Sequence, residues 1–137
     1  MYDNLLRFYI NGEWVAPFGQ TRLGVENPAT EETFAQLALG SAADADRAVT
    51  AARDAFARFS AVPVAERIAL VQRILDGYNA RYDDFATAMR LEMGAPLAWS
   101  RDAQAWAGQV HLEAAIKAAQ SMHWEEMRGT TRIIHEG

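Results

Sequence analysis

The sequence contains no cysteine among its 137 residues, and its cations are outnumbered, with 13 Lys and Arg against 18 Asp and Glu. The missing thiols exclude disulfides and cysteine-ligated zinc or iron–sulfur sites. A net charge of −5 without clustered Lys and Arg argues against a nucleic-acid partner, because phosphates require such clusters. Half of the residues are hydrophobic, which is enough for one globular domain with a core.

Signals for membranes, phosphates and metals are also missing. No apolar run approaches the length that spans a bilayer, and residues 1–4 do not begin a secretory signal. We therefore expect no membrane partner and a cytoplasmic location. Neither Gly-x-Gly-x-x-Gly nor a Walker loop is present to hold a phosphate. The histidines lack metal-ligand spacing, which favours ordinary structural or surface roles for His111, His123 and His135.

The first forty residues have the pattern of β-hairpins. Asn11-Gly12 separates two aromatic-rich stretches, and both residues tolerate positive φ, which predicts a type I′ turn. Asn27-Pro28-Ala29-Thr30 predicts the turn of a second hairpin, whose returning strand runs from Thr33 to Leu39. We expect these two hairpins over about residues 8–39.

A period of 3.6 residues replaces the alternation after Gly40, and it predicts about four helices over residues 42–123. The Ser41–Asp44 spacing is that of a capping box, and the first helix is expected from about Ala42 to Phe59. Gly94 is expected to end the third helix. The apolar stripe of the second helix consists of Val64, Ile68, Val71, Leu75 and Tyr78.

The fourth helix is expected from Pro96 to about Met122, with apolar residues on two sides, as in a helix sandwiched between partners. One stripe consists of Trp99, Ala103, Trp106 and Val110, and the other of Leu112, Ala115, Ile116, Ala119 and Met122. The tryptophans could line an aromatic groove, but core or interface packing is the favoured interpretation. A single final strand is expected at about 130–135. The whole pattern predicts an α+β fold.

Four segments, in this order and at these distances, resemble the amino-terminal part of the aldehyde dehydrogenase superfamily. They are 8–14 (FYINGEW), 26–32 (ENPATEE), 65–67 (AER) and 91–96 (LEMGAP). The chain departs from the usual family pattern at Glu31, where glycine is usual, and at Ala95, where lysine is common. The resemblance implies that residues 1–137 are a single partial domain, the N-terminal portion of an α/β nucleotide-binding domain.

The resemblance also implies the chemistry of the whole enzyme: thiolate attack on an aldehyde, hydride transfer to NAD(P)⁺ and thioester hydrolysis. The nucleophilic cysteine, the general-base glutamate and the cofactor loop of that family have no counterparts here. We therefore assign no catalytic or cofactor-binding residue to this chain, and its expected partner is the rest of the enzyme chain.

One possible site carries over from the family. Some members hold a monovalent cation with backbone carbonyls before the Asn-Pro and an acid before the Gly-x-Pro, which correspond here to Val25, Glu26 and Glu92. Oxygen donors of this kind suit a hard cation. The alternative is that Glu92 is an ordinary surface residue in the last helical turn.

The rival hypothesis is a non-enzymatic helical module that reuses this segment for self-association or interaction. Both hypotheses share the expectation of a homo-oligomer, because a helix that is apolar on two sides tends to find a partner. Multi-angle light scattering tests that expectation, and a monomer mass that persists at high concentration would contradict it.

We predict that the 137-residue chain alone oxidises no aldehyde and binds neither NAD⁺ nor NADP⁺, because it lacks the thiol and the phosphate loop. Incubation with either cofactor and an aldehyde panel should produce no NAD(P)H absorbance above a blank. Steady turnover by the purified chain would show that this interpretation is wrong.

Overall fold

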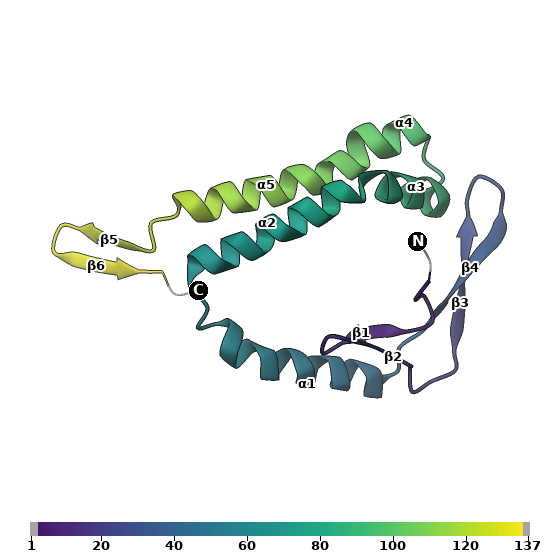
Figure 1. Ribbon diagram of the computed structural model, residues 1–137, viewed down its shortest axis with the longest axis horizontal. Coiled ribbons are helices and arrows are strands. Elements are labelled where there is room, and N and C mark those ends of the chain that lie inside the picture. Colours follow the sequence, from purple (N-terminus) through teal and green to yellow (C-terminus); the bar gives the residue numbers. More distant parts are fainter. Residues whose placement is uncertain (1–2, 136–137) are drawn as a thin grey trace.

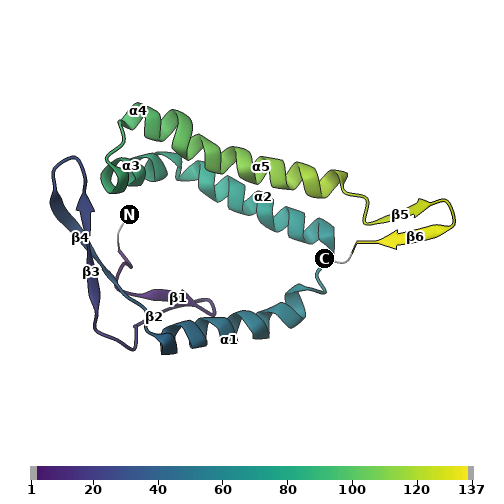
Figure 2. The ribbon, with the colours of Figure 1, turned by 180° about the vertical axis from the view of Figure 1, so that it is seen from behind.

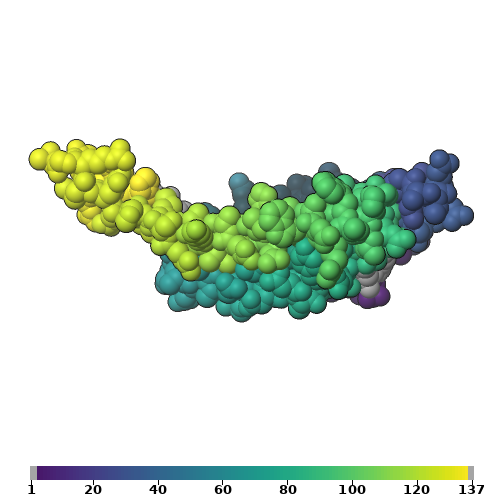
Figure 3. All heavy atoms as spheres, turned by 90° about the horizontal axis from the view of Figure 1, so that it is seen from above, coloured from purple at the N-terminus to yellow at the C-terminus, as the bar shows by residue number. Residues whose placement is uncertain are grey.

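The computed structural model describes residues 3–135 as an open arch of helices and hairpins. Helix α1 forms one side, and the paired helices α2 and α5 form the other (Figures 1 and 2). The hairpin β3–β4 closes one end of the arch, while the hairpin β5–β6 projects beyond the helices at the opposite end (Figure 3). The expected mixed architecture of hairpins and helices is confirmed, although two of its details are not.

The two N-terminal hairpins form as expected. β1 (Phe8–Ile10) pairs with β2 (Glu13–Val15), and β3 (Arg22–Asn27) pairs with β4 (Glu32–Ala38), both in antiparallel register. Asn11 and Gly12 have φ of 54° and 83°, the left-handed conformation that a type I′ turn requires at both central positions.

Helix α1 (Ala42–Phe59) begins at the predicted capping box. The Asp44 carboxylate accepts hydrogen bonds from the backbone N–H of Ser41 at 2.8 Å and from its hydroxyl at 2.7 Å. It also accepts one from the N–H of Phe18 at 3.0 Å, which ties the loop after β2 to the helix. These hydrogen bonds, with those from Ser41 foremost, lower the pKa of Asp44, so this buried side chain is a structural anion.

Helices α2 (Val64–Ala80) and α3 (Tyr82–Met93) follow, and α2 packs along α5. The predicted stripe of α2 faces this contact. Leu75 is buried with 6% of its surface exposed, and the other four members of the stripe are partly buried. Gly94 has φ of 68° and caps α3, as expected for a helix that ends in a left-handed residue.

The fourth helical stretch is not one regular helix, which corrects the prediction. It consists of α4 (Leu97–Trp99), the π-helical segment η1 (Ser100–Ala105) and α5 (Trp106–Ser121). Two tyrosine hydroxyls donate to carbonyls of η1: Tyr82 to Arg101 at 2.6 Å and Tyr78 to Ala105 at 2.7 Å. These donors satisfy backbone acceptors where the regular helical hydrogen bonds are interrupted.

The π-helical turns also change which residues are buried. Ser100 and Ala105 are fully buried, whereas Trp99 and Trp106 are 61% and 53% exposed. A wider turn rotates Trp106 and the residues after it away from the positions that a 3.6-residue period assigns to them, whereas Trp99 precedes the segment. The prediction that the two tryptophans pack in a core is therefore wrong for the described chain. Their packing at an interface stays a prediction. In the second stripe, Ile116 is buried as expected.

The C-terminal element is a hairpin rather than a single strand. β5 (Glu125–Arg128) pairs with β6 (Thr131–Ile134), and Gly129 between them has φ of 62°. The pattern of β5 lacks an apolar alternation, so the sequence does not distinguish it from a solvated stretch. Across the two strands, the exposed Arg132 side chain forms an ion pair with Glu125 at 2.6 Å.

The close approach of α2 and α5 predicts stability changes of opposite sign for two glycine-to-alanine substitutions. A methyl group at Gly108 would collide with the Tyr78 hydroxyl and lie 2.7 Å from its Cζ, whereas a methyl group at Gly77 meets nothing within 4 Å. Gly108→Ala should destabilise the chain by about 1–3 kcal/mol through overpacking. Gly77→Ala should stabilise it by about 0.4–1 kcal/mol. Urea unfolding measures both, and equal effects would contradict the packing described.

Candidate functional site

The described residues 3–135 contain no group of three or more His, Cys, Asp or Glu side chains arranged to hold a metal ion. The three histidines are all exposed, in agreement with surface roles. Among these residues, none of the helices has the length and apolar character to cross a membrane. A candidate site must therefore be sought where backbone groups and single charged side chains meet.

The Asn-Pro-Ala-Thr turn between β3 and β4 is tightly organised. The side-chain carbonyl of Asn27 accepts a hydrogen bond from the N–H of Ala29 at 3.0 Å. The backbone carbonyl of Asn27 accepts from the N–H groups of Thr30 at 3.1 Å and Glu31 at 2.8 Å. Glu31 has φ of 58°, a left-handed conformation that glycine adopts without strain. The position where the family usually has glycine is thus one where the backbone itself favours it.

This turn lies against the C-terminal end of α3. A Cβ at Gly94 would be 3.2 Å from Cβ of Pro28, so Gly94 is suited both to its left-handed φ and to the close approach of the proline. The fold consequently brings together two segments that lie more than sixty residues apart in sequence. Figure 1 shows α3 beside the β3–β4 hairpin.

The three predicted cation-site residues lie on β3 and α3, the two elements that meet at this junction. Val25 and Glu26 lie in β3, at an irregularity where Val25 pairs with Ala35 but Glu26 pairs with Thr33. Glu92 lies in the last turn of α3, two residues before Gly94. Val25 is partly buried, and both glutamates are exposed. A β-bulge interrupts regular pairing and redirects backbone groups, which is compatible with carbonyl donors at Val25 and Glu26.

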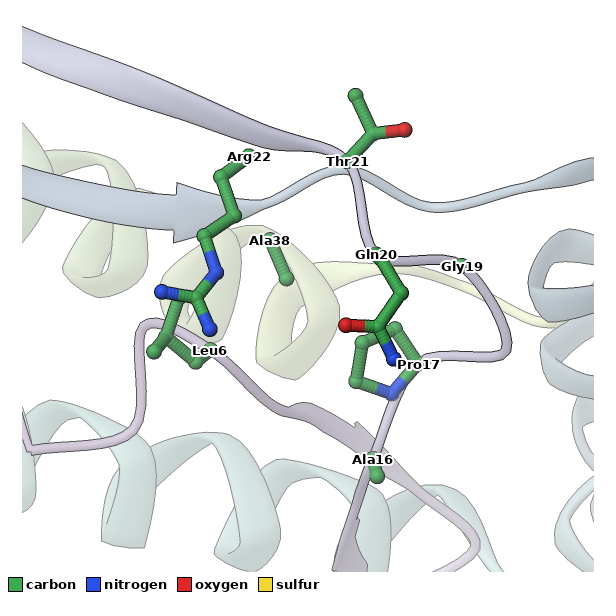
Figure 4. A pocket seen from close by; sticks show the side chains of 8 residues that line it. All are labelled: Leu6, Ala16, Pro17, Gly19, Gln20, Thr21, Arg22 and Ala38. Carbon is green, nitrogen blue, oxygen red and sulfur yellow. The ribbon is translucent and has the colours of Figure 1, made fainter.

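A separate hollow of about 190 Å³ lies between the two hairpins (Figure 4). Its lining is formed by Leu6, Ala38 and the connection between β2 and β3. The side chains of Gln20 and Arg22 extend into it, whereas that of Thr21 points away. The lining contains one cation, Arg22, and no carboxylate, so an acid–base pair of carboxylates is not formed there.

The tyrosine pair that holds the π-helical segment was not predicted from the sequence. Burial raises the pKa of the Tyr78 hydroxyl, which therefore remains a hydrogen-bond donor to Ala105. The ring of Tyr78 also stacks on Phe85, with centroids 4.3 Å apart. Two tyrosines four residues apart, one near the end of α2 and one at the start of α3, together with a glycine in α5, are the only sequence signal for this arrangement.

Comparisons with known proteins agree on one family. The sequence profile of the aldehyde dehydrogenase family matches residues 14–135. A curated protein of Staphylococcus aureus (strain USA300) that carries the aldehyde dehydrogenase name is 41% identical over 128 residues. The alignment covers 93% of this chain but 27% of that relative.

Solved structures give the same result. Aldehyde dehydrogenase C from Pseudomonas syringae, a mutant solved with NAD⁺ and octanal, is 38% identical, with a TM-score of 0.90 over 96% of this chain and 27% of its own. An aldehyde dehydrogenase from Bartonella henselae is also 38% identical, with a TM-score of 0.88 over 90% of this chain and 26% of its own. The chain thus spans about a quarter of the length of these relatives.

Proposed function

Because this chain belongs to the aldehyde dehydrogenase family, we propose that it is the N-terminal part of the nucleotide-binding domain of an NAD(P)-dependent aldehyde-oxidising enzyme. The observation that carries the proposal is the overlay of 96% of the chain, at a TM-score of 0.90, on a relative whose structure contains NAD⁺ and octanal. That relative also makes NAD⁺ the cofactor to test first.

The role of this segment is structural. Its 137 residues contain no cysteine, so the bond-making steps belong to other parts of an enzyme of this family. The segment supplies helices and hairpins with exposed apolar side chains, which can support neighbouring elements of the domain. We keep the cytoplasm as the proposed compartment, and microscopy of a fluorescent fusion tests it.

A hybrid enzyme tests the proposed function directly. The 137 residues replace the matching quarter of the Pseudomonas syringae enzyme in its unmutated form, which keeps the cysteine that the solved mutant lacks, and NADH absorbance is followed with octanal and NAD⁺. We expect NADH formation, because 96% of the segment overlays on that enzyme with a TM-score of 0.90. A folded hybrid that forms no NADH would contradict the proposal and favour the rival interaction module.

We further propose that Val25, Glu26 and Glu92 hold a monovalent cation, with the first two contributing backbone carbonyls and Glu92 its carboxylate. The bulge in β3 and its position beside α3 support this assignment. The hybrid should melt at a higher temperature in NaCl than in choline chloride of equal ionic strength. Glu92→Gln should abolish the difference, while Glu26→Gln should preserve it because its backbone carbonyl remains. If both variants lose the melting-temperature difference equally, the difference would depend on negative charge alone, and the proposed cation site would be contradicted.

A further inference from the structure

The turn at the tip of the hairpin β1–β2 joins two residues that can react with each other. Asn11 and Gly12 are its central pair, and both are exposed. Within residues 3–135, the N–H of Gly12 donates to no acceptor, and a Cβ at this position would meet nothing within 4 Å. The nitrogen of Gly12 is therefore accessible to the carboxamide of Asn11, which lies one residue before it.

We infer that Asn11 is a site of spontaneous deamidation, a covalent modification that requires only water. The backbone nitrogen of Gly12 attacks Cγ of Asn11, and the two residues form a cyclic imide. The bond from Cγ to the side-chain nitrogen breaks, and ammonia leaves with the proton lost by Gly12. Water then opens the ring, giving aspartate when it cleaves at Cγ and isoaspartate when it cleaves at the main-chain carbonyl carbon. An amide and water thus become a carboxylate and ammonium, without oxidation or reduction.

The hairpin must open at its tip before the ring can close, because the attack requires rotation about the Cα–C bond of Asn11. Strands β1 and β2 have three residues each, and among the described residues they form a sheet of only two strands. A two-stranded hairpin gains little stability from its own pairing. Such an element opens locally at low free energy, so the fold permits the attack.

The other three asparagines of the chain each lack one of these conditions. Asn27 precedes a proline, whose nitrogen has no hydrogen to lose. Asn79 and the residue after it belong to α2, where N–H groups donate to carbonyls of the preceding turn. Asn4 is partly buried and precedes a partly buried leucine, whose side chain crowds the attacking nitrogen. We therefore expect the modification at Asn11 alone.

The products differ from asparagine in charge and, for isoaspartate, in main-chain length. Asn11 lines a hollow of about 320 Å³ between the hairpin and α1, together with the acids Glu13 and Asp54 and the base Arg47. A further carboxylate adds negative charge to a lining that already has more acids than bases. Isoaspartate adds a methylene to the main chain, which the tight turn between Glu13 and the buried Ile10 cannot accommodate. The modification should therefore weaken the attachment of the hairpin to α1.

Ageing of the purified 137-residue chain in mildly alkaline buffer tests this inference independently of the proposed function. Peptide mapping by mass spectrometry should show loss of the amide at Asn11, while the amides of Asn4, Asn27 and Asn79 remain. Enzymatic methylation should detect isoaspartate in the same peptide. A higher pH should increase the rate, because the attacking nitrogen must lose its proton. The matched control Asn11→Gly suits a type I′ turn and should release no ammonia.

The chain unfolded in guanidinium chloride gives the reactivity of Asn11 without the fold. If Asn11 loses its amide there but keeps it in the folded chain, the turn protects it and the inference is overturned. Absence of reaction in both states, or equal loss at Asn4 or Asn79 in the folded chain, overturns it as well.

The effect on the hairpin is measured by denaturant unfolding before and after ageing. The aged chain, enriched in isoaspartate, should unfold at a lower denaturant concentration, whereas Asn11→Gly aged in the same way should keep its midpoint. An unchanged midpoint of the modified chain would overturn the predicted weakening of the contact between the hairpin and α1.

Discussion

The contact of Tyr78 with the backbone of η1 and α5 is the constraint on which the helical layer depends. Its hydroxyl lies where a side chain at position 108 would be and donates to the carbonyl of Ala105. The donor can reach this carbonyl only because residue 108 is glycine and because the π-helical turns leave backbone acceptors available. The same ring stacks on Phe85, so one side chain joins α2, α3 and α5.

Local patterns predicted the parts of the fold that local physics determines. The left-handed turn at Asn11-Gly12, the capping box at Asp44 and the cap at Gly94 each follow from a few adjacent residues. The π-helical segment was not predictable in this way, because the tyrosine donor lies 27 residues from its acceptor. Strand β5 was missed because cross-strand charges, rather than an apolar alternation, accompany its pairing.

The candidate site also combines a feature that adjacent residues predict with one that depends on residues far apart in sequence. The turn at residues 27–30 was recognisable from its sequence, and its geometry explains why glycine would suit position 31. The meeting of that turn with Gly94 could be expected only from the family resemblance, since no periodicity connects segments so far apart. The sequence contains no cysteine, so under the proposed function the covalent steps of the dehydrogenase fall to residues outside this segment.

The central claim is that α2 and α5 form a packed unit within this chain, while α1 contacts β1 and no described helix to a comparable extent. Hydrogen–deuterium exchange on the isolated chain tests it most directly, since exchange reports the local free energy of opening. The account predicts strong protection of amides in α2 and α5 around Leu75 and Ile116, and much faster exchange across α1 beyond Ala51. Equal protection of α1 and α2 would contradict it.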